Sequence, residues 1–133
     1  YEAVASALGA ALGIDQSHTE ALAALGELCL DTGRELVAAG HGELGIQRLS
    51  EAWAWYQRLL ALQPGDANGL YNAACVHGIA GNVALGLECL GRARSAEELA
   101  EADMEEWVRG VVTDADLGNL HQDPQFALIV TIQ

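Results

Sequence analysis

The sequence predicts an all-α fold, and three observations support this. Hydrophobic residues make up 51% of the chain, whereas aromatic residues make up only 5%, so alanine and leucine must supply most of the core. Both residues favour helices, whereas strands prefer β-branched and aromatic side chains. Apolar residues recur at helical spacing along the chain, and turn residues such as glycine, asparagine and proline separate the periodic segments. We expect one domain, residues 1–133, because this length is sufficient to bury a single core.

The first segment, residues 1–13, places four apolar residues on one face of a predicted helix: Val4, Leu8, Ala11 and Leu12. An apolar face at the end of a helical stack needs cover. We therefore expect this edge to support self-association into a homo-oligomer. The sequence contains no helix before this segment that could pair with it in a hairpin, so we also expect the chain to be a piece of a longer protein.

A long helical hairpin follows. The segment Ser17-His18-Thr19-Glu20 has the spacing of a capping box, which predicts a helix start. Helices are predicted over 18–39 and 43–62, with Gly40-His41-Gly42 as the turn between them. In the second helix we expect Trp53 and Tyr56 to be core residues.

A second hairpin is predicted over 66–80 and 83–94. Pro64-Gly65-Asp66 forms the turn before it, and Ala80-Gly81-Asn82 forms its own turn. His77 is expected to be a core residue of this hairpin. Ser95 to Glu98 has the capping-box spacing again and predicts a helix from about 96 to 112.

The C-terminal segment contains two further predicted helix starts. The first lies in Thr113-Asp114-Ala115-Asp116-Leu117, and Asp123 can cap the second, with Pro124 at its first helical position. We expect these short helices to cover the end of the last hairpin.

The central residues resemble the tetratricopeptide repeat (TPR) family, whose unit is two antiparallel helices in about 34 residues. Ala52 and Gly86 are 34 residues apart, as are Tyr56 and Leu90, and Pro64 ends the repeat. The segment from Asp114 to Phe126 resembles the closing DxDLxxLxxDPxF pattern of many bacterial TPR proteins. The resemblance implies a TPR-like α-solenoid with a partial repeat (1–16), a lengthened repeat (17–64), a standard repeat (65–98) and capping helices (99–133).

The lengthened repeat contains an insertion. The first helix of a TPR unit has a pattern that Leu22, Leu25, Gly26 and Cys29 resemble. Leu22 precedes Leu70, the equivalent residue of the next unit, by 48 residues. This spacing exceeds the family period by about 14 residues. About seven residues added to each helix are close to two turns, so the buried faces keep their direction. We expect residues 33–47 to extend both helices.

The resemblance implies a protein-interaction module whose first helices form a concave groove for a peptide or an extended segment of a partner protein. The implied lining residues are Glu20, Ala23, Glu27, Leu30, Asp31, Asn68, Tyr71, Asn72, Cys75 and Ile79. Glu20, Glu27 and Asp31 fall on one helix face, so we expect a basic or mixed apolar-basic partner. Two alternatives stay open: an oligomerisation or scaffold segment, and a non-catalytic regulatory domain of a larger enzyme.

The net charge of −13 limits the partners further. All six basic residues are arginines, and such an acidic surface repels phosphate backbones and anionic lipids. We therefore expect no nucleic-acid partner, and no apolar run is long enough for a membrane span. An ordinary solvated acidic surface would account for the same charge.

No motif points to catalysis. The four histidines lack metal-ligand spacing, no glycine-rich phosphate-binding motif occurs, and the acidic clusters of residues 97–106 fit an exposed helix face. We predict a non-enzyme without catalytic residues, metal or cofactor. Cys29, Cys75 and Cys89 include no C-x-x-C pair, which predicts buried thiols in a reducing, cytoplasmic compartment.

Overall fold

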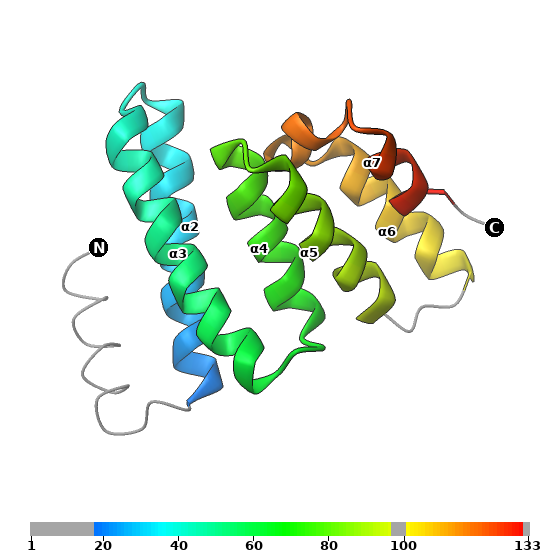
Figure 1. Ribbon diagram of the computed structural model, residues 1–133, viewed down its shortest axis with the longest axis horizontal. Coiled ribbons are helices and arrows are strands. Elements are labelled where there is room, and N and C mark those ends of the chain that lie inside the picture. The colour runs from blue at the N-terminus through cyan, green and yellow to red at the C-terminus, as the bar shows by residue number, and fades with distance from the viewer. Residues whose placement is uncertain (1–17, 97–100, 132–133) are drawn as a thin grey trace.

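The computed structural model describes residues 18–96 and 101–131, and within these ranges it is helical, with no strand. The all-α class is therefore confirmed. In chain order the helices are α2 (Thr19–Ala38), α3 (Gly42–Leu62), α4 (Ala67–Ala80), α5 (Val83–Ala96), α6 (Glu101–Thr113), the 3₁₀ helix η1 (Ala115–Leu120) and α7 (Pro124–Ile129) (Figure 1). The expected self-association edge at Val4, Leu8, Ala11 and Leu12 lies outside the described residues.

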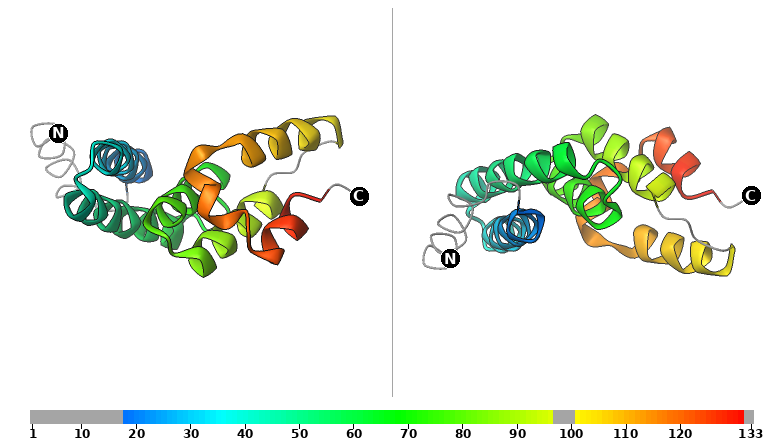
Figure 2. Two further views of the ribbon diagram at one scale, coloured as in Figure 1. Left: turned by 90° about the horizontal axis from the view of Figure 1, so that it is seen from above. Right: turned by 90° about the horizontal axis from the view of Figure 1, so that it is seen from below.

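Two antiparallel hairpins, α2/α3 and α4/α5, pack side by side (Figure 1). Helix α4 contacts both helices of the first hairpin, and it also packs against η1. Seen from above, α2 and α6 project to the same side of the molecule, and α4 lies between them (Figure 2). None of the described helices is long and apolar enough to cross a lipid bilayer.

Residues 33–47 extend both helices of the first hairpin instead of forming a long loop, as predicted. Helix α2 continues to Ala38, and α3 begins at Gly42. The turn contains Gly40, whose φ of 88° suits glycine. Near this tip the two helices approach closely, because a Cβ atom built on Gly45 would lie only 2.5 Å from Val37 Cγ2.

Two predicted helix starts need correction. The N-cap of α2 is His18, whose Nδ1 accepts a hydrogen bond from Ala21 N at 3.0 Å. The predicted start at Ser95 is wrong, because α5 continues through Ala96. The Ser95 hydroxyl donates to the Gly91 carbonyl at 3.1 Å, as serine does inside a helix.

Both predicted C-terminal helix starts are confirmed, and so is the cap at Asp123. Asp114 accepts from Asp116 N, and Asp123 accepts from Gln125 N. Helix α7 packs on α5, where Arg94 donates to the carbonyl of Ile129. The chain therefore folds back over the second hairpin.

The core lies between the hairpins and under η1. Tyr56 is buried, and its ring lies 2.7 Å from a Cβ atom built on Gly26, which explains why that position needs glycine. All three cysteines are buried and form no disulfide. His77 is only 2% exposed, and its ring meets Trp53 edge-on with centroids 4.4 Å apart. The side chain of Asn82 lies 3.4 Å from His77 Nδ1, whereas His77 Nε2 is buried with no hydrogen-bond partner.

This environment predicts a pH-dependent stability. Burial lowers the pKa of His77 below 6.5, and the charge of Glu88 only partly opposes this. The unfolded chain therefore binds more protons than the folded chain just below pH 6.5, and the free energy of unfolding falls as the pH drops through this region. We expect urea denaturation at pH 7, 6 and 5 to show a smaller loss for His77→Phe than for the unmodified chain. Parallel losses in both chains would contradict a role for His77.

Candidate functional site

Two hollows lie on the face that α2, α4 and α6 share, one on each side of α4. The α2–α4 hollow has a volume of about 360 Å³ and is lined by Ala23, Glu27, Tyr56, Leu59, Asp66, Asn68, Gly69 and Asn72. The α4–α6 hollow has a volume of about 480 Å³ and is lined by Asn68, Tyr71, Asp103, Glu106, Trp107, Gly110 and Val111. Asn68, which is exposed on α4, lines both hollows, so they adjoin on the two sides of this helix, and we call the two together the groove.

Five of the ten residues predicted for the groove line these hollows: Ala23, Glu27, Asn68, Tyr71 and Asn72. They come from α2 and α4, the first helices of the two hairpins. The structure therefore brings half of the predicted set together on one face.

Three predicted lining residues need correction. Leu30 is only 2% exposed and Cys75 only 3% exposed, so neither presents a surface to a partner. Ile79 is half-buried against the core and lines neither hollow. Cys75 is buried because the chain returns through Asp114 and η1, which pack against α4.

The two remaining residues, Glu20 and Asp31, are exposed on α2 but line neither hollow. Asp31 accepts a hydrogen bond from Arg34 Nη1 at 2.7 Å. Arg34 therefore neutralises part of the charge of Asp31, and neither side chain lines the hollows. Of the acidic residues of α2, Glu27 lines the groove and Asp31 does not.

Helix α6 supplies residues that the sequence prediction missed. Asp103 precedes Glu106 and Trp107 by three and four positions, and Gly110 follows them by four and three, so the four residues share the helix face that lines the hollow. This spacing was available in the sequence. What sequence reasoning lacked was the position of α6 opposite α4.

The groove combines negative charge with aromatic surface. Its described lining residues include four carboxylates, those of Glu27, Asp66, Asp103 and Glu106, and no basic side chain. Asp66 also caps α4 by accepting from Gly69 N at 3.2 Å. This arrangement favours positively charged ligands and repels anions.

Tyr71 and Trp107 form the aromatic part of the α4–α6 hollow. Their ring centroids are 6.5 Å apart and their planes meet at 73°. The Tyr71 hydroxyl donates to Asp114 Oδ2 at 2.7 Å, which fixes the ring in place. Burial first, and then this hydrogen bond, raise the pKa of Tyr71 above its ordinary range, so its hydroxyl keeps its proton at neutral pH.

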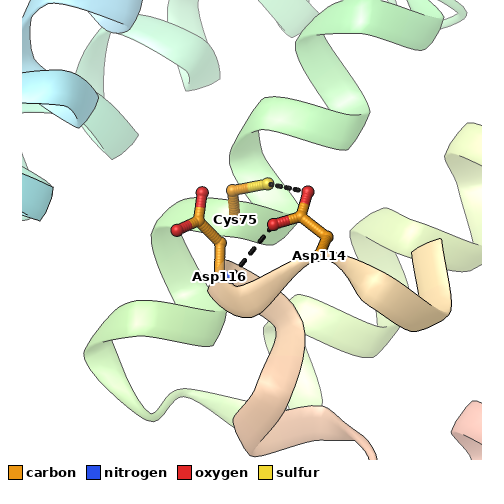
Figure 3. A group of neighbouring side chains, drawn as sticks. All are labelled: Cys75, Asp114 and Asp116. Atoms are coloured by element: carbon orange, nitrogen blue, oxygen red, sulfur yellow. Dashed lines mark hydrogen bonds between the residues drawn. The ribbon is translucent and has the colours of Figure 1, made fainter. Parts of the chain in front are cut away.

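Against the interior of α4, Cys75, Asp114 and Asp116 lie close together (Figure 3). One potential ligand atom from each residue lies within 4.8 Å of the others, which is compatible in distance with a metal site. The Cys75 Sγ atom points toward Asp114, at 4.0 Å from Oδ2, and the Asp116 N–H donates to Asp114 Oδ1 at 3.0 Å (Figure 3).

The chemistry of this cluster does not fit a metal ion. Arg34 donates from Nε and Nη2 to both carboxylate oxygens of Asp116, at distances from 2.6 to 3.1 Å. Tyr71 already donates to Asp114. Burial first, and then the charge of Asp114, raise the pKa of the Cys75 thiol, so this thiol keeps its proton in the cluster. Arg34, Tyr71, Asp114 and Asp116 instead form a structural contact, which we call the Arg34 clamp.

Comparisons of the chain with protein-family models, with curated proteins and with solved structures found no match. The fold and the groove define an all-helical protein built from antiparallel hairpins, with an acidic, aromatic face. Any more specific assignment depends on the residues and their geometry.

Proposed function

We propose that the chain is a TPR-like protein-interaction module that holds an extended, basic or mixed apolar-basic segment of a partner protein. The observation that carries this proposal is the groove across α4, where four carboxylates and two aromatic rings line adjoining hollows. The repeat spacing of about 34 residues and the paired hairpins also support a TPR-like arrangement.

The shape of the groove favours a chain segment as the ligand. Side chains of an extended segment alternate in direction, so residues two positions apart can point toward the same surface. The two hollows on either side of α4 can each accept a side chain while the backbone of the segment crosses Asn68. A segment of a few residues would thereby contact all three of α2, α4 and α6.

The energetics divide between the two kinds of lining residue. Exposed ion pairs contribute only about 0.2–1 kcal/mol each, so the carboxylates mainly set the association rate and the preference for basic partners. Aromatic side chains dominate the binding energy of most interfaces. We expect Tyr71 and Trp107, which are half-buried, to provide most of the affinity.

A charge reversal with a matched control tests the proposal. Binding peptides would first be selected from a random peptide library, and their affinities measured by fluorescence anisotropy at low and high salt. Glu106→Arg should weaken binding about tenfold, because it replaces attraction with repulsion in the groove. Glu105→Arg makes the same charge change on the adjacent residue, which does not line the hollow, and should change the affinity by less than about twofold.

The selected peptides should carry an excess of arginine and lysine, and their affinity should fall with salt. Peptides without this excess, salt-insensitive binding, or equal losses for the Glu105 and Glu106 variants would contradict the proposal.

A scaffold function is the second candidate. A third hollow of about 660 Å³ lies away from the groove, against α5 and α7, and Leu128 beside it is 74% exposed. Exposed apolar surface of this kind suits a contact between subunits or domains. A regulatory domain of a larger enzyme would contact the rest of that enzyme through either the groove or this third hollow.

A further inference from the structure

We infer that the α4–α6 hollow is a recognition pocket for one arginine side chain of the partner segment, an inference that rests on the proposed binding function. A guanidinium group is planar and always charged, and it recognises carboxylates and aromatic faces at the same time. The hollow presents both kinds of group: Asp103 and Glu106 as carboxylates, and Tyr71 and Trp107 as rings.

The residues of α6 that line the hollow have the spacing that such a pocket requires. Trp107 follows Asp103 by four residues and Glu106 by one, so the ring and both carboxylates lie on neighbouring parts of one helix face. Gly110, one turn beyond Glu106, contributes no side chain, and a Cβ atom built there would meet nothing within 4 Å. The pocket therefore has room for a long side chain to enter beside Trp107.

The aromatic pair is held in place before any ligand arrives. The hydrogen bond from Tyr71 to Asp114 fixes one ring, and Trp107 meets it at 73°, so the two rings form two different walls. A cation near the face of a tryptophan ring is attracted to its electron density. Because the ring of Tyr71 is already fixed and Trp107 packs beside it, binding need not order these two rings.

Other side chains satisfy this pocket less well. Lysine carries a compact, strongly hydrated charge that cannot stack on a ring or form a bidentate pair. An acidic side chain is repelled by Asp103 and Glu106. An apolar side chain contacts the rings but takes water from the carboxylates without replacing its hydrogen bonds.

Three short blocked peptides, Ala-Ala-X-Ala-Ala with arginine, lysine or citrulline at X, provide the probes. Citrulline has nearly the shape of arginine but no charge. Binding would be followed by ¹H–¹⁵N NMR, with the Trp107 indole N–H signal assigned through Trp107→Phe. We expect saturable shifts of this signal with the arginine peptide, binding at least about fivefold weaker with lysine, and no saturable shift with citrulline.

Variants locate the site. The double variant Asp103→Asn, Glu106→Gln keeps the shape of the pocket and should weaken the arginine peptide by at least about fivefold. Glu105→Gln removes an equivalent exposed charge outside the pocket and should leave its affinity unchanged.

Equal binding of arginine and citrulline peptides, or equal losses in the Glu105 variant and the double variant, would overturn the inference. The result remains separable from the proposed function. If library-selected peptides bind the groove while the arginine peptide leaves the Trp107 signal unmoved, the arginine pocket is wrong and the interaction module stands. If neither binds, both proposals fall.

Discussion

Replacing Gly78 with alanine is expected to destabilise the folded chain by about 3 kcal/mol, in the upper part of the range for overpacked sites. A Cβ atom at this position would lie 2.3 Å from the carbonyl oxygen of Asp116 and 3.4 Å from Leu117 Cα. Both neighbours are backbone atoms, so no side-chain rotation relieves the clash. Helix α4 and η1 must then separate. The measurement is the urea midpoint of unfolding.

Separation of η1 from α4 would also weaken the contacts that hold it. Asn119 Nδ2 donates to the Gly78 carbonyl at 2.8 Å, and Arg34 binds Asp116 from the other side. The matched control is Gly91→Ala in α5, where the nearest atom to a built Cβ is 3.9 Å away. That variant should be neutral or up to about 1 kcal/mol more stable, because alanine favours a helix interior. Equal losses in the two variants would show that close packing at Gly78 is not the cause.

The sequence predicted the hairpins well because their determinants are local. The prediction of a helix over 18–39 differs from α2, Thr19–Ala38, by one residue at each end. The spacing of the apolar residues predicts where the helices lie, and the glycines at residues 40 and 42 predict the turn between α2 and α3. The caps at Asp114 and Asp123 were also predictable, since each carboxylate bonds a backbone N–H only two residues away.

The groove was only half predictable because its limits depend on distant contacts. Arg34 and Asp116 are 82 residues apart in sequence, yet their side chains bond directly. This contact accompanies the return of η1 onto α4, where Cys75 is buried beside Asp114. No local sequence pattern around Cys75 indicates that η1 and Asp114 cover it. The contribution of Trp107 depends in the same way on where α6 lies relative to α4.

The Arg34 clamp gives the second large expected effect. Arg34→Met retains much of the apolar stem but removes the cation that faces Asp116, whose side chain is only 14% exposed. The carboxylate of Asp116 then remains beside the carboxylate of Asp114 and buried Cys75 without its cationic partner. Breaking a fully buried pair costs about 3–5 kcal/mol. We expect about 2 kcal/mol here, because the Arg34 side chain is 40% exposed and water screens part of the charge.

A double variant distinguishes the lost ion pair from lost packing. Arg34→Met combined with Asp116→Asn removes both charges, so it should be more stable than Arg34→Met alone, with a coupling energy of about 1–2 kcal/mol. Arg58→Met is the control, since Arg58 is exposed and lies 5.0 Å from the Trp55 ring centroid, a contact that contributes about 0.5–1 kcal/mol. Urea denaturation at neutral pH measures five chains: the unmodified chain, Arg34→Met, Asp116→Asn, the double variant and Arg58→Met. If Arg34→Met costs no more than Arg58→Met, or if Asp116→Asn gives no recovery, the clamp does not hold η1 to α2. The Tyr71–Asp114 bond would then be the main polar contact that fixes this end of the groove.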